Sequence, residues 1–119
     1  MIRILLVDDR ADFRLAFASL LESQPDMEVV GTAASLAEAR QKLRGVDIAL
    51  LDRGLPDGDG LELVGELRAL NRGARVFVIS STGEVRHPTD AIEAGADGVI
   101  DKFDHPERVF TAIREPGGG

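Results

Sequence analysis

Short aliphatic runs alternate along the chain with segments whose apolar residues recur every three or four positions. The first pattern is typical of buried parallel strands and the second of amphipathic helices. The aliphatic runs predict strands over residues 2–7, 28–33, 47–51, 75–79 and 98–101. The helical spacing predicts helices over residues 12–21, 35–45, 61–70, 89–94 and 106–114.

Residues with strong local preferences support several of these boundaries. Gln24-Pro25 ends the first helix, because proline has no backbone N–H to donate. Ser35 to Glu38 has the form of a capping box, in which each side chain accepts a backbone N–H at the start of a helix. Pro88 falls where the middle of the fourth helix would lie, so this helix is predicted to be shortened, with Gly95 as its C-terminal cap.

Alternating strands and helices predict an α/β fold with a doubly wound, five-stranded parallel sheet. A helix between successive strands requires parallel pairing and a right-handed crossover. Strands that are aliphatic throughout indicate helices on both faces of the sheet. Ligands of such sheets bind beyond the carboxyl ends of the strands, so the residues that follow the strands are the candidates for function.

Composition narrows the classes of function. The 119 residues suit one domain, and 44% hydrophobic residues are enough for a packed core. A formal net charge of −7 disfavours direct nucleic-acid binding, because an acidic surface repels phosphates. No run of about 18 apolar residues occurs, so we expect no membrane-spanning helix and a cytoplasmic location. The absence of cysteine excludes disulfides, thiolate metal ligands and a cysteine nucleophile.

Polar residues of matching chemistry follow four of the predicted strands. They are Asp8 and Asp9, Asp52, Ser80 and Lys102. Three carboxylates at one edge of a sheet repel one another and need a cation. Ligation by oxygen alone favours a hard ion such as Mg²⁺. A carboxylate can also attack phosphorus, which gives an aspartyl phosphate.

Each of these residues also has a purely structural interpretation. Asp8 and Asp9 could cap the first helix, and Asp52 could be a strand-end acid that starts a turn. Ser80 could cap the next helix or simply end its strand, and Lys102 could be a solvated surface residue. The chemical interpretation is favoured because all of these residues converge on one edge of a single predicted sheet.

Four stretches together resemble the receiver domains of two-component response regulators over essentially the whole chain. They are ILLVDDRADFR, DIALLDRGLPDGDGLELV, VFVISS and AGADGVIDK. The LLD-x-x-LPDGDG segment is specific, and its style is closest to receivers that precede a helix-turn-helix output domain of the LuxR or NarL type. The resemblance implies a CheY-like, flavodoxin-like fold with strand order 2-1-3-4-5.

The resemblance implies that Asp52 accepts a phosphoryl group from the phosphohistidine of a sensor histidine kinase or a phosphotransfer protein. It implies a Mg²⁺ ion held by the carboxylates of Asp8, Asp9 and Asp52 and by the backbone carbonyl of Gly54. Such a domain at most catalyses its own phosphorylation and dephosphorylation, so we expect no enzyme that acts on an external substrate.

The resemblance also assigns the residues around the phosphoryl group. Ser80 would be the switch hydroxyl, and Lys102 would bind the phosphate. Gly54 and Thr82 fall where the family tunes the lifetime of its phosphoaspartate. A glycine at position 54 would leave that side of the site open to water or to a partner.

Four positions depart from the usual pattern of the family. Val99 replaces the Tyr or Phe that swings inward with the switch hydroxyl, and Phe103 stands where Pro, Asp or Ser usually follows the lysine. Pro88 interrupts the fourth helix, on a face that many receivers use for output, and Arg53 follows the acceptor where an apolar or neutral residue is usual. These departures keep open an alternative, an atypical receiver that acts as a phosphorylation-independent protein-interaction module.

Residues 1–115 are predicted to form the receiver domain, and residues 116–119 a linker or the end of the chain. By analogy alone, a helix-turn-helix output domain beyond residue 119 would make the whole protein a transcription regulator. A weak homodimer is expected from the family, without membrane or direct nucleic-acid contact. A phosphatase of the haloacid-dehalogenase type is disfavoured, because it needs a second acid two residues after the nucleophile, where Gly54 stands.

Overall fold

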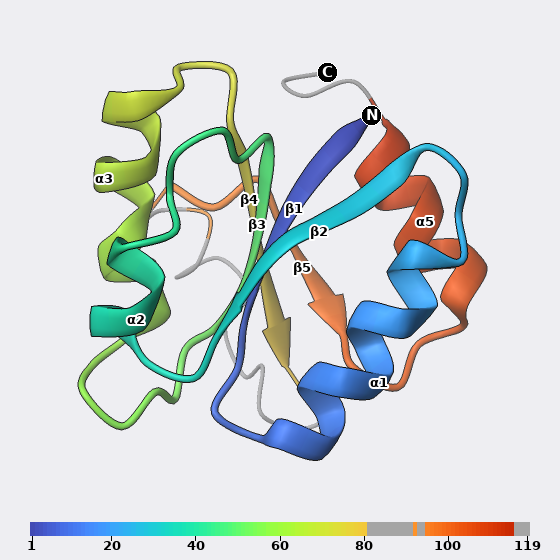
Figure 1. The fold of residues 1–119 in the computed structure, drawn as a ribbon, viewed down its shortest axis with the longest axis horizontal. Coiled ribbons are helices and arrows are strands. Elements are labelled where there is room, and N and C mark those ends of the chain that lie inside the picture. Colours follow the sequence, from blue (N-terminus) through green and yellow to red (C-terminus); the bar gives the residue numbers. More distant parts are fainter. Residues whose placement is uncertain (81–91, 93–94, 116–119) are drawn as a thin grey trace.

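The structure, a computed structural model, describes residues 1–80, 92 and 95–115. Figure 1 shows its strands as one twisted sheet with helices on both sides. The strands are β1 (Ile2–Val7), β2 (Met27–Ala33), β3 (Ile48–Asp52), β4 (Arg75–Ser80) and β5 (Gly98–Asp101). The helices are α1 (Ala11–Glu22), α2 (Leu36–Arg40), the 3₁₀ turn η1 (Gly60–Glu62), α3 (Leu63–Leu70) and α5 (Pro106–Arg114).

The strands pair in the order β2-β1-β3-β4-β5, and every pairing is parallel. This confirms the predicted doubly wound α/β fold and its strand order. Asp52 pairs with Ile79, and Ser80 pairs with Asp101. The register therefore brings the carboxyl ends of β3, β4 and β5 to one edge of the sheet.

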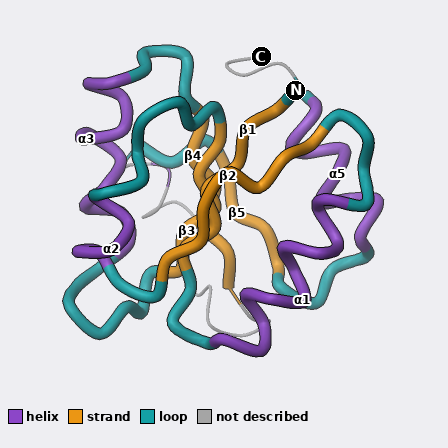
Figure 2. The backbone as a smooth tube through the Cα atoms, in the orientation of Figure 1, coloured by secondary structure: helices purple, strands orange, loops and turns teal. Residues whose placement is uncertain are grey.

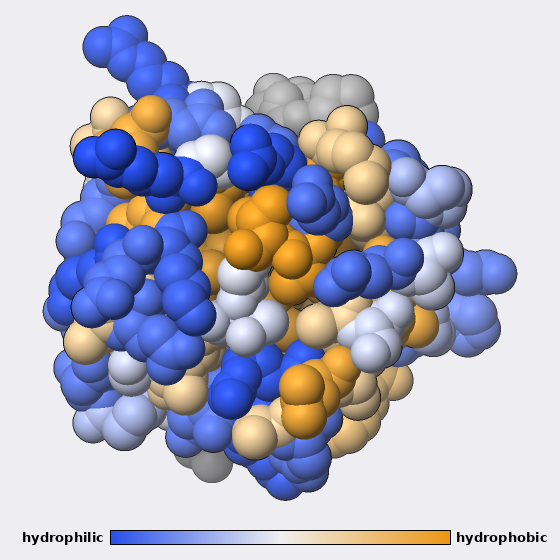
Figure 3. Space-filling model, viewed as in Figure 1, coloured by the Kyte–Doolittle hydropathy of each residue, from blue (hydrophilic) through white to orange (hydrophobic). Residues whose placement is uncertain are grey.

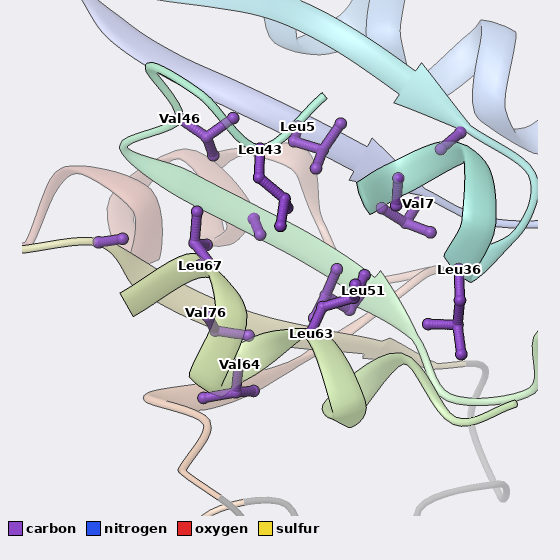
Figure 4. Packing of buried hydrophobic residues seen from close by; sticks show 14 of the residues in the cluster. Leu5, Val7, Leu36, Leu43, Val46, Leu51, Leu63, Val64, Leu67 and Val76 are labelled. Atoms are coloured by element: carbon purple, nitrogen blue, oxygen red, sulfur yellow. The ribbon is translucent and has the colours of Figure 1, made fainter. Parts of the chain in front are cut away.

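Two hydrophobic clusters fill the two faces of the sheet. One lies under α2 and α3 and contains Leu5 and Val7 of β1 (Figure 4), and the other lies under α1 and α5 and contains Ile4 and Leu6. Neighbouring residues of a strand point to opposite faces, so β1 contributes alternately to both clusters. Figure 2 shows the same division, with α2 and α3 on one side and α1 and α5 on the other. Burial on both faces explains why the strands are aliphatic throughout.

The strand predictions are accurate to about one residue, whereas two helix predictions need correction. α2 ends at Arg40, well before Gly45. Leu43 and Val46 are nevertheless buried, so a turn here produced the apolar spacing that suggested a longer helix. The helix predicted over residues 61–70 begins as the 3₁₀ turn η1 and becomes α-helical only at Leu63.

The predicted capping box at Ser35 is only half formed. The Ser35 hydroxyl accepts the Glu38 N–H at 3.2 Å, but the Glu38 carboxylate accepts the N–H of Ala34 and not that of Ser35. A complete capping box stands instead between Asp59 and Glu62, at the start of η1. The sequence did not predict this capping box, because Asp59 stands where Ser or Thr is usual and the preceding segment has the composition of a glycine-rich loop.

Several predictions fall on residues 81–91, 93–94 and 116–119, outside the described part of the chain. These are the shortened fourth helix with Pro88, the role of Thr82 and the terminal linker. At the boundary of that part, Gly95 has a φ of 105° and donates its N–H to the Ile92 carbonyl at 2.9 Å.

The surface shown in Figure 3 has apolar side chains over the sheet at its β2 edge, with hydrophilic side chains on both sides. Val29 and Val30 of β2 are only partly buried there. Among the described residues, no helix has both the length and the apolar character needed to cross a membrane.

Candidate functional site

Asp8 directly follows β1 and is fully buried. Its Oδ1 accepts the Arg10 N–H at 2.8 Å, and its Oδ2 lies 2.6 Å from Lys102 Nζ. Arg14 of α1 donates to the Asp8 carbonyl at 2.8 Å, which fixes the backbone at the same point. Arg10 is the N-cap of α1, and its side chain makes no capping hydrogen bond. A first-turn N–H, that of Phe13, is accepted by Asp12 and not by Asp8 or Asp9. The geometry therefore speaks against the capping interpretation of Asp8 and Asp9.

Asp52 is the last residue of β3, and its side chain is 13% exposed. Its Oδ1 accepts the Gly54 N–H at 3.1 Å, and its Oδ2 lies 3.6 Å from Lys102 Nζ. Burial raises the pKa of Asp52 above its usual value of 3.8, and the charges of Asp8 and Asp9 add to this rise. The Gly54 N–H and Lys102 oppose it. The carboxylate is thus held in a place where an additional positive charge would stabilise its ionised form.

The three carboxylates meet at the edge of the sheet. One oxygen from each of Asp8, Asp9 and Asp52 lies within 4.8 Å of the others. Asp8 is buried, Asp52 is partly buried and Asp9 is exposed, so the cluster opens to solvent on one side. Mg²⁺ takes a few carboxylates and keeps several of its waters, so these donors in this arrangement fit it.

Lys102 follows β5 and reaches into the same cluster. Its side chain is only 8% exposed, and its ammonium lies between Asp8 and Asp52. The ammonium also lies 4.8 Å from the centre of the Phe13 ring, which stacks on Phe17 within α1. The interpretation of Lys102 as a solvated surface residue is therefore wrong.

Ser80 ends β4 and is 7% exposed. Its hydroxyl oxygen is buried and has no hydrogen-bond partner in the part of the chain that the structure describes. Burying a hydroxyl without a partner is unfavourable. This hydroxyl can therefore donate to an oxygen atom that binds at the edge of the sheet.

Gly60 lies directly against the backbone of the acceptor residue. A Cβ atom at position 60 would collide with the carbonyl oxygen of Asp52 and would lie 3.2 Å from the Cβ of Leu51. Gly54 is different, since a Cβ there would meet only Asp52 Oδ1, at 3.9 Å. The wall beside the Asp52 carboxylate thus has room for a side chain at position 54.

Three of the four residues that depart from the family pattern lie in the described part of the chain. Arg53 pairs with Asp59 of its own loop at 3.0 Å. Val99 is partly buried and packs against Val78 and Ala96. Phe103 is 76% exposed.

Two contacts near the site were not predicted from the sequence. Phe13 has the helical spacing of a core residue, yet its ring lies beside the lysine ammonium. Asp57 belongs to a stretch typical of a turn, yet it binds the backbone at the start of α2. Spacing along one segment cannot show a contact with a distant segment.

The family model described as "Response regulator receiver domain" matches residues 4–114. The chain is 35% identical over 121 residues to the DNA-binding transcriptional activator DevR/DosR of Mycobacterium tuberculosis, covering 100% of this chain and 56% of that protein. It is 33% identical over 115 residues to the chemotaxis protein CheY of Bacillus subtilis, covering 95% of each. The response regulator domain of Thermotoga maritima CheB superposes with a TM-score of 0.81 at 28% identity, covering 98% of this chain and 96% of that one.

The chain spans 56–60% of the length of the first transcriptional regulators that it matches. Domains of this family bind Mg²⁺ at an acidic pocket and interact with histidine kinases and output domains. They are signalling modules and not classical enzymes. The match of the family model, the sheet order and the relatives agree, and the chain belongs to the receiver domains of two-component response regulators.

Proposed function

We propose that this receiver takes a phosphoryl group onto Asp52 from the phosphohistidine of a sensor histidine kinase or a phosphotransfer protein. One observation carries the proposal: Asp52 shares the ammonium of Lys102 with Asp8, and the buried hydroxyl of Ser80, at the end of the neighbouring strand, has no hydrogen-bond partner among the described residues. Such a set can receive the charge of a phosphoryl group from several sides.

In the proposed step, a carboxylate oxygen of Asp52 attacks phosphorus and forms the new P–O bond. The P–N bond of the donor breaks, and its electron pair stays on the imidazole nitrogen. The Lys102 ammonium, 3.6 Å from Asp52 Oδ2, moves its interaction from the carboxylate to a phosphoryl oxygen. Mg²⁺ held by Asp8, Asp9, Asp52 and the Gly54 carbonyl supplies positive charge at the phosphoryl oxygens when it is bound.

Ser80 is the proposed sensor of the new group. Its hydroxyl gains a hydrogen bond to a phosphoryl oxygen that it lacks within the described unphosphorylated domain. A hydrogen bond to a charged acceptor contributes about 1.5–3 kcal/mol, enough to shift the backbone at Ser80. Because position 99 holds a valine, the switch works without an inward rotation of an aromatic ring. Repacking of an ordered fourth helix around Val99 on phosphorylation would contradict this part of the proposal.

The rest of the protein follows from its relatives. We infer that residues 1–115 are the receiver and that residues 116–119 begin a linker to a helix-turn-helix output domain, since the matched regulators are longer than this chain. The whole protein would then regulate transcription in the cytoplasm, with a weak homodimer sensitive to phosphorylation.

The test is the intact mass of the protein after incubation with Mg²⁺ and a small phosphodonor, beside Asp52→Ala. We expect one added phosphoryl group on the wild type and none on the variant. The second candidate function, a phosphorylation-independent interaction module, is favoured by Val99 and by the exposed Phe103. It would be supported by a wild type that neither binds Mg²⁺ nor gains mass.

A further inference from the structure

The loop that follows the acceptor, residues 53–59, is fastened to α2 by one side chain. Asp57 accepts the N–H of Leu36 through Oδ1 at 2.8 Å and the N–H of Ala37 through Oδ2 at 3.0 Å. Ser35 accepts the next N–H, that of Glu38, at 3.2 Å. The first three N–H groups of α2 are thus bound by two side chains, one local and one from the loop 53–59.

The ionised form of Asp57 makes these contacts. The hydrogen bonds from Leu36 and Ala37 lower the pKa of Asp57 below its usual value. A negative charge also interacts favourably with the partial positive charge at a helix N-terminus. Asp57 is therefore committed to α2, and its role differs from that of the acids at the edge of the sheet.

The same loop contacts the acceptor at its other end. Gly54 donates its N–H to Asp52 Oδ1 at 3.1 Å. Between Gly54 and Asp57, the chain is closed by two backbone hydrogen bonds that join Leu55 and Gly58, at 3.2 and 3.4 Å. Leu55 is buried beneath this turn. The anchor on α2, Asp57, therefore lies inside this closed turn, and the donor to the acceptor, Gly54, directly precedes it.

Close packing leaves this turn little freedom to move. Gly58 has a φ of 149°, and a Cβ atom there would lie 2.6 Å from Leu36 Cδ1 and would collide with the Glu62 carboxylate. Only glycine fits both the backbone angle and the space. Gly58 of this turn packs against the side chain of Leu36, the residue whose N–H Asp57 accepts.

We propose that Asp57 is a positioning residue for the phosphoacceptor: by binding the start of α2 it holds the loop 53–59, and through Gly54 it orients the Asp52 carboxylate. This inference rests on the proposed function, because it adds a residue to the support of the same site. It makes α2 a part of the phosphorylation site, although the cluster of Asp8, Asp9 and Asp52 contains no residue of α2.

The chain offers a matched control, since Ser35 and Asp57 bind the same helix end and only Asp57 belongs to the loop. Asp57→Ala and Ser35→Ala should both lower the urea midpoint of unfolding. Only Asp57→Ala should weaken Mg²⁺ binding and slow phosphorylation by the small phosphodonor, by about tenfold, the lower end of what loss of a supporting hydrogen-bond partner costs. Asp57→Asn keeps one acceptor oxygen and should recover part of the rate.

A second readout, which needs no Mg²⁺, is hydrogen exchange of the Gly54 amide followed by NMR. It should become faster in Asp57→Ala and stay unchanged in Ser35→Ala. If the wild type is phosphorylated but both alanine variants slow it equally, the positioning role is wrong and the proposed function stands. If the wild type gains no phosphoryl group, the proposed function is wrong. In that case, equal exchange rates of the Gly54 amide in the two alanine variants would also show that Asp57 does not act on Gly54 through the loop 53–59.

Discussion

Charged side chains are paired with oppositely charged or polar partners at the amino end of the sheet, whereas acids are crowded together at its carboxyl end. At the amino end, Arg75 donates to the carbonyl oxygens of Ile113 and Glu115 where α5 ends, and Arg114 forms two hydrogen bonds with Asp26 at 2.7 and 2.8 Å. At the carboxyl end, three carboxylates crowd together, and one lysine lies within 4 Å of two of them.

The comparison shows where this domain gains stability and where it gives stability up. At the amino end, the arginine that donates to the last carbonyl groups of α5 holds this helix on the sheet, and this raises the free energy of unfolding. Crowded acids and a buried hydroxyl without a described partner at the carboxyl end oppose folding, as is common where a site needs groups that do not favour stability. Substitutions at the two ends should therefore have different effects on stability and phosphorylation.

The largest expected effect is that of Lys102→Met. It leaves the fully buried Asp8 without its ion pair, and breaking a buried pair by removing one partner costs about 3 kcal/mol. The control is Lys42→Met, which removes an exposed pair with Glu38 and should cost about 1 kcal/mol or less. Urea unfolding without Mg²⁺ measures both, and equal losses would contradict the buried pairing.

Arg75→Met should cost about 2 kcal/mol, because carbonyl groups at the end of α5 lose a charged donor. The control is Arg72→Met, an exposed arginine in the turn before β4, which should leave stability unchanged. Phosphorylation of the folded Arg75→Met variant should match that of the wild type. A slower rate at equal folded fraction would show that the two ends are not independent.

Asp52→Asn should stabilise the metal-free domain at neutral pH, by less than the two losses above. The pKa of Asp52 is raised by burial, so this carboxyl contributes most to stability while it is protonated, and that contribution is lost as pH rises through the raised pKa. The two proteins should have equal stability in acid, below a pH of about 3.8, and separate towards neutral pH. Urea midpoints measured across this range test the sign, and a wild type that is more stable at pH 7 would reverse it.

The smallest effect is expected of Phe13→Leu. A cation–π contact at a partly exposed site contributes about 0.5–1 kcal/mol, so phosphorylation should slow by about twofold to fivefold. Phe17→Leu serves as the control, because it alters the partner ring and leaves Phe13 beside the lysine. It should lower stability more than it lowers the rate.

The sequence predicted the sheet well because a strand buried on both faces has a simple signature. Once parallel pairing was inferred, the positions of Asp8, Asp52 and Lys102 at one edge followed from topology. The structure brings these three together, as predicted.

Features that depend on contacts between distant segments were not predictable. The bonds from Asp57 to α2 span 20 and 21 residues, and the contact between Phe13 and Lys102 joins the first helix to the last strand. The predicted end of one helix was also wrong. The turn over residues 41–45 buries Leu43, and its apolar residues therefore have the spacing of a helix. Local patterns report which face of a segment is buried, but not which segment covers it.

The contact of Arg75 with α5 has a consequence for signalling distance. β4 runs from Arg75 to Ser80, and six residues at about 3.3 Å each extend for about 20 Å. Figure 1 shows that α5 returns along the sheet and ends beside the starts of the strands. A segment attached after Glu115 therefore begins about one strand length from the Asp52 carboxylate. Unless that segment folds back along the domain, it senses Asp52 only through the backbone and packing that lie between them.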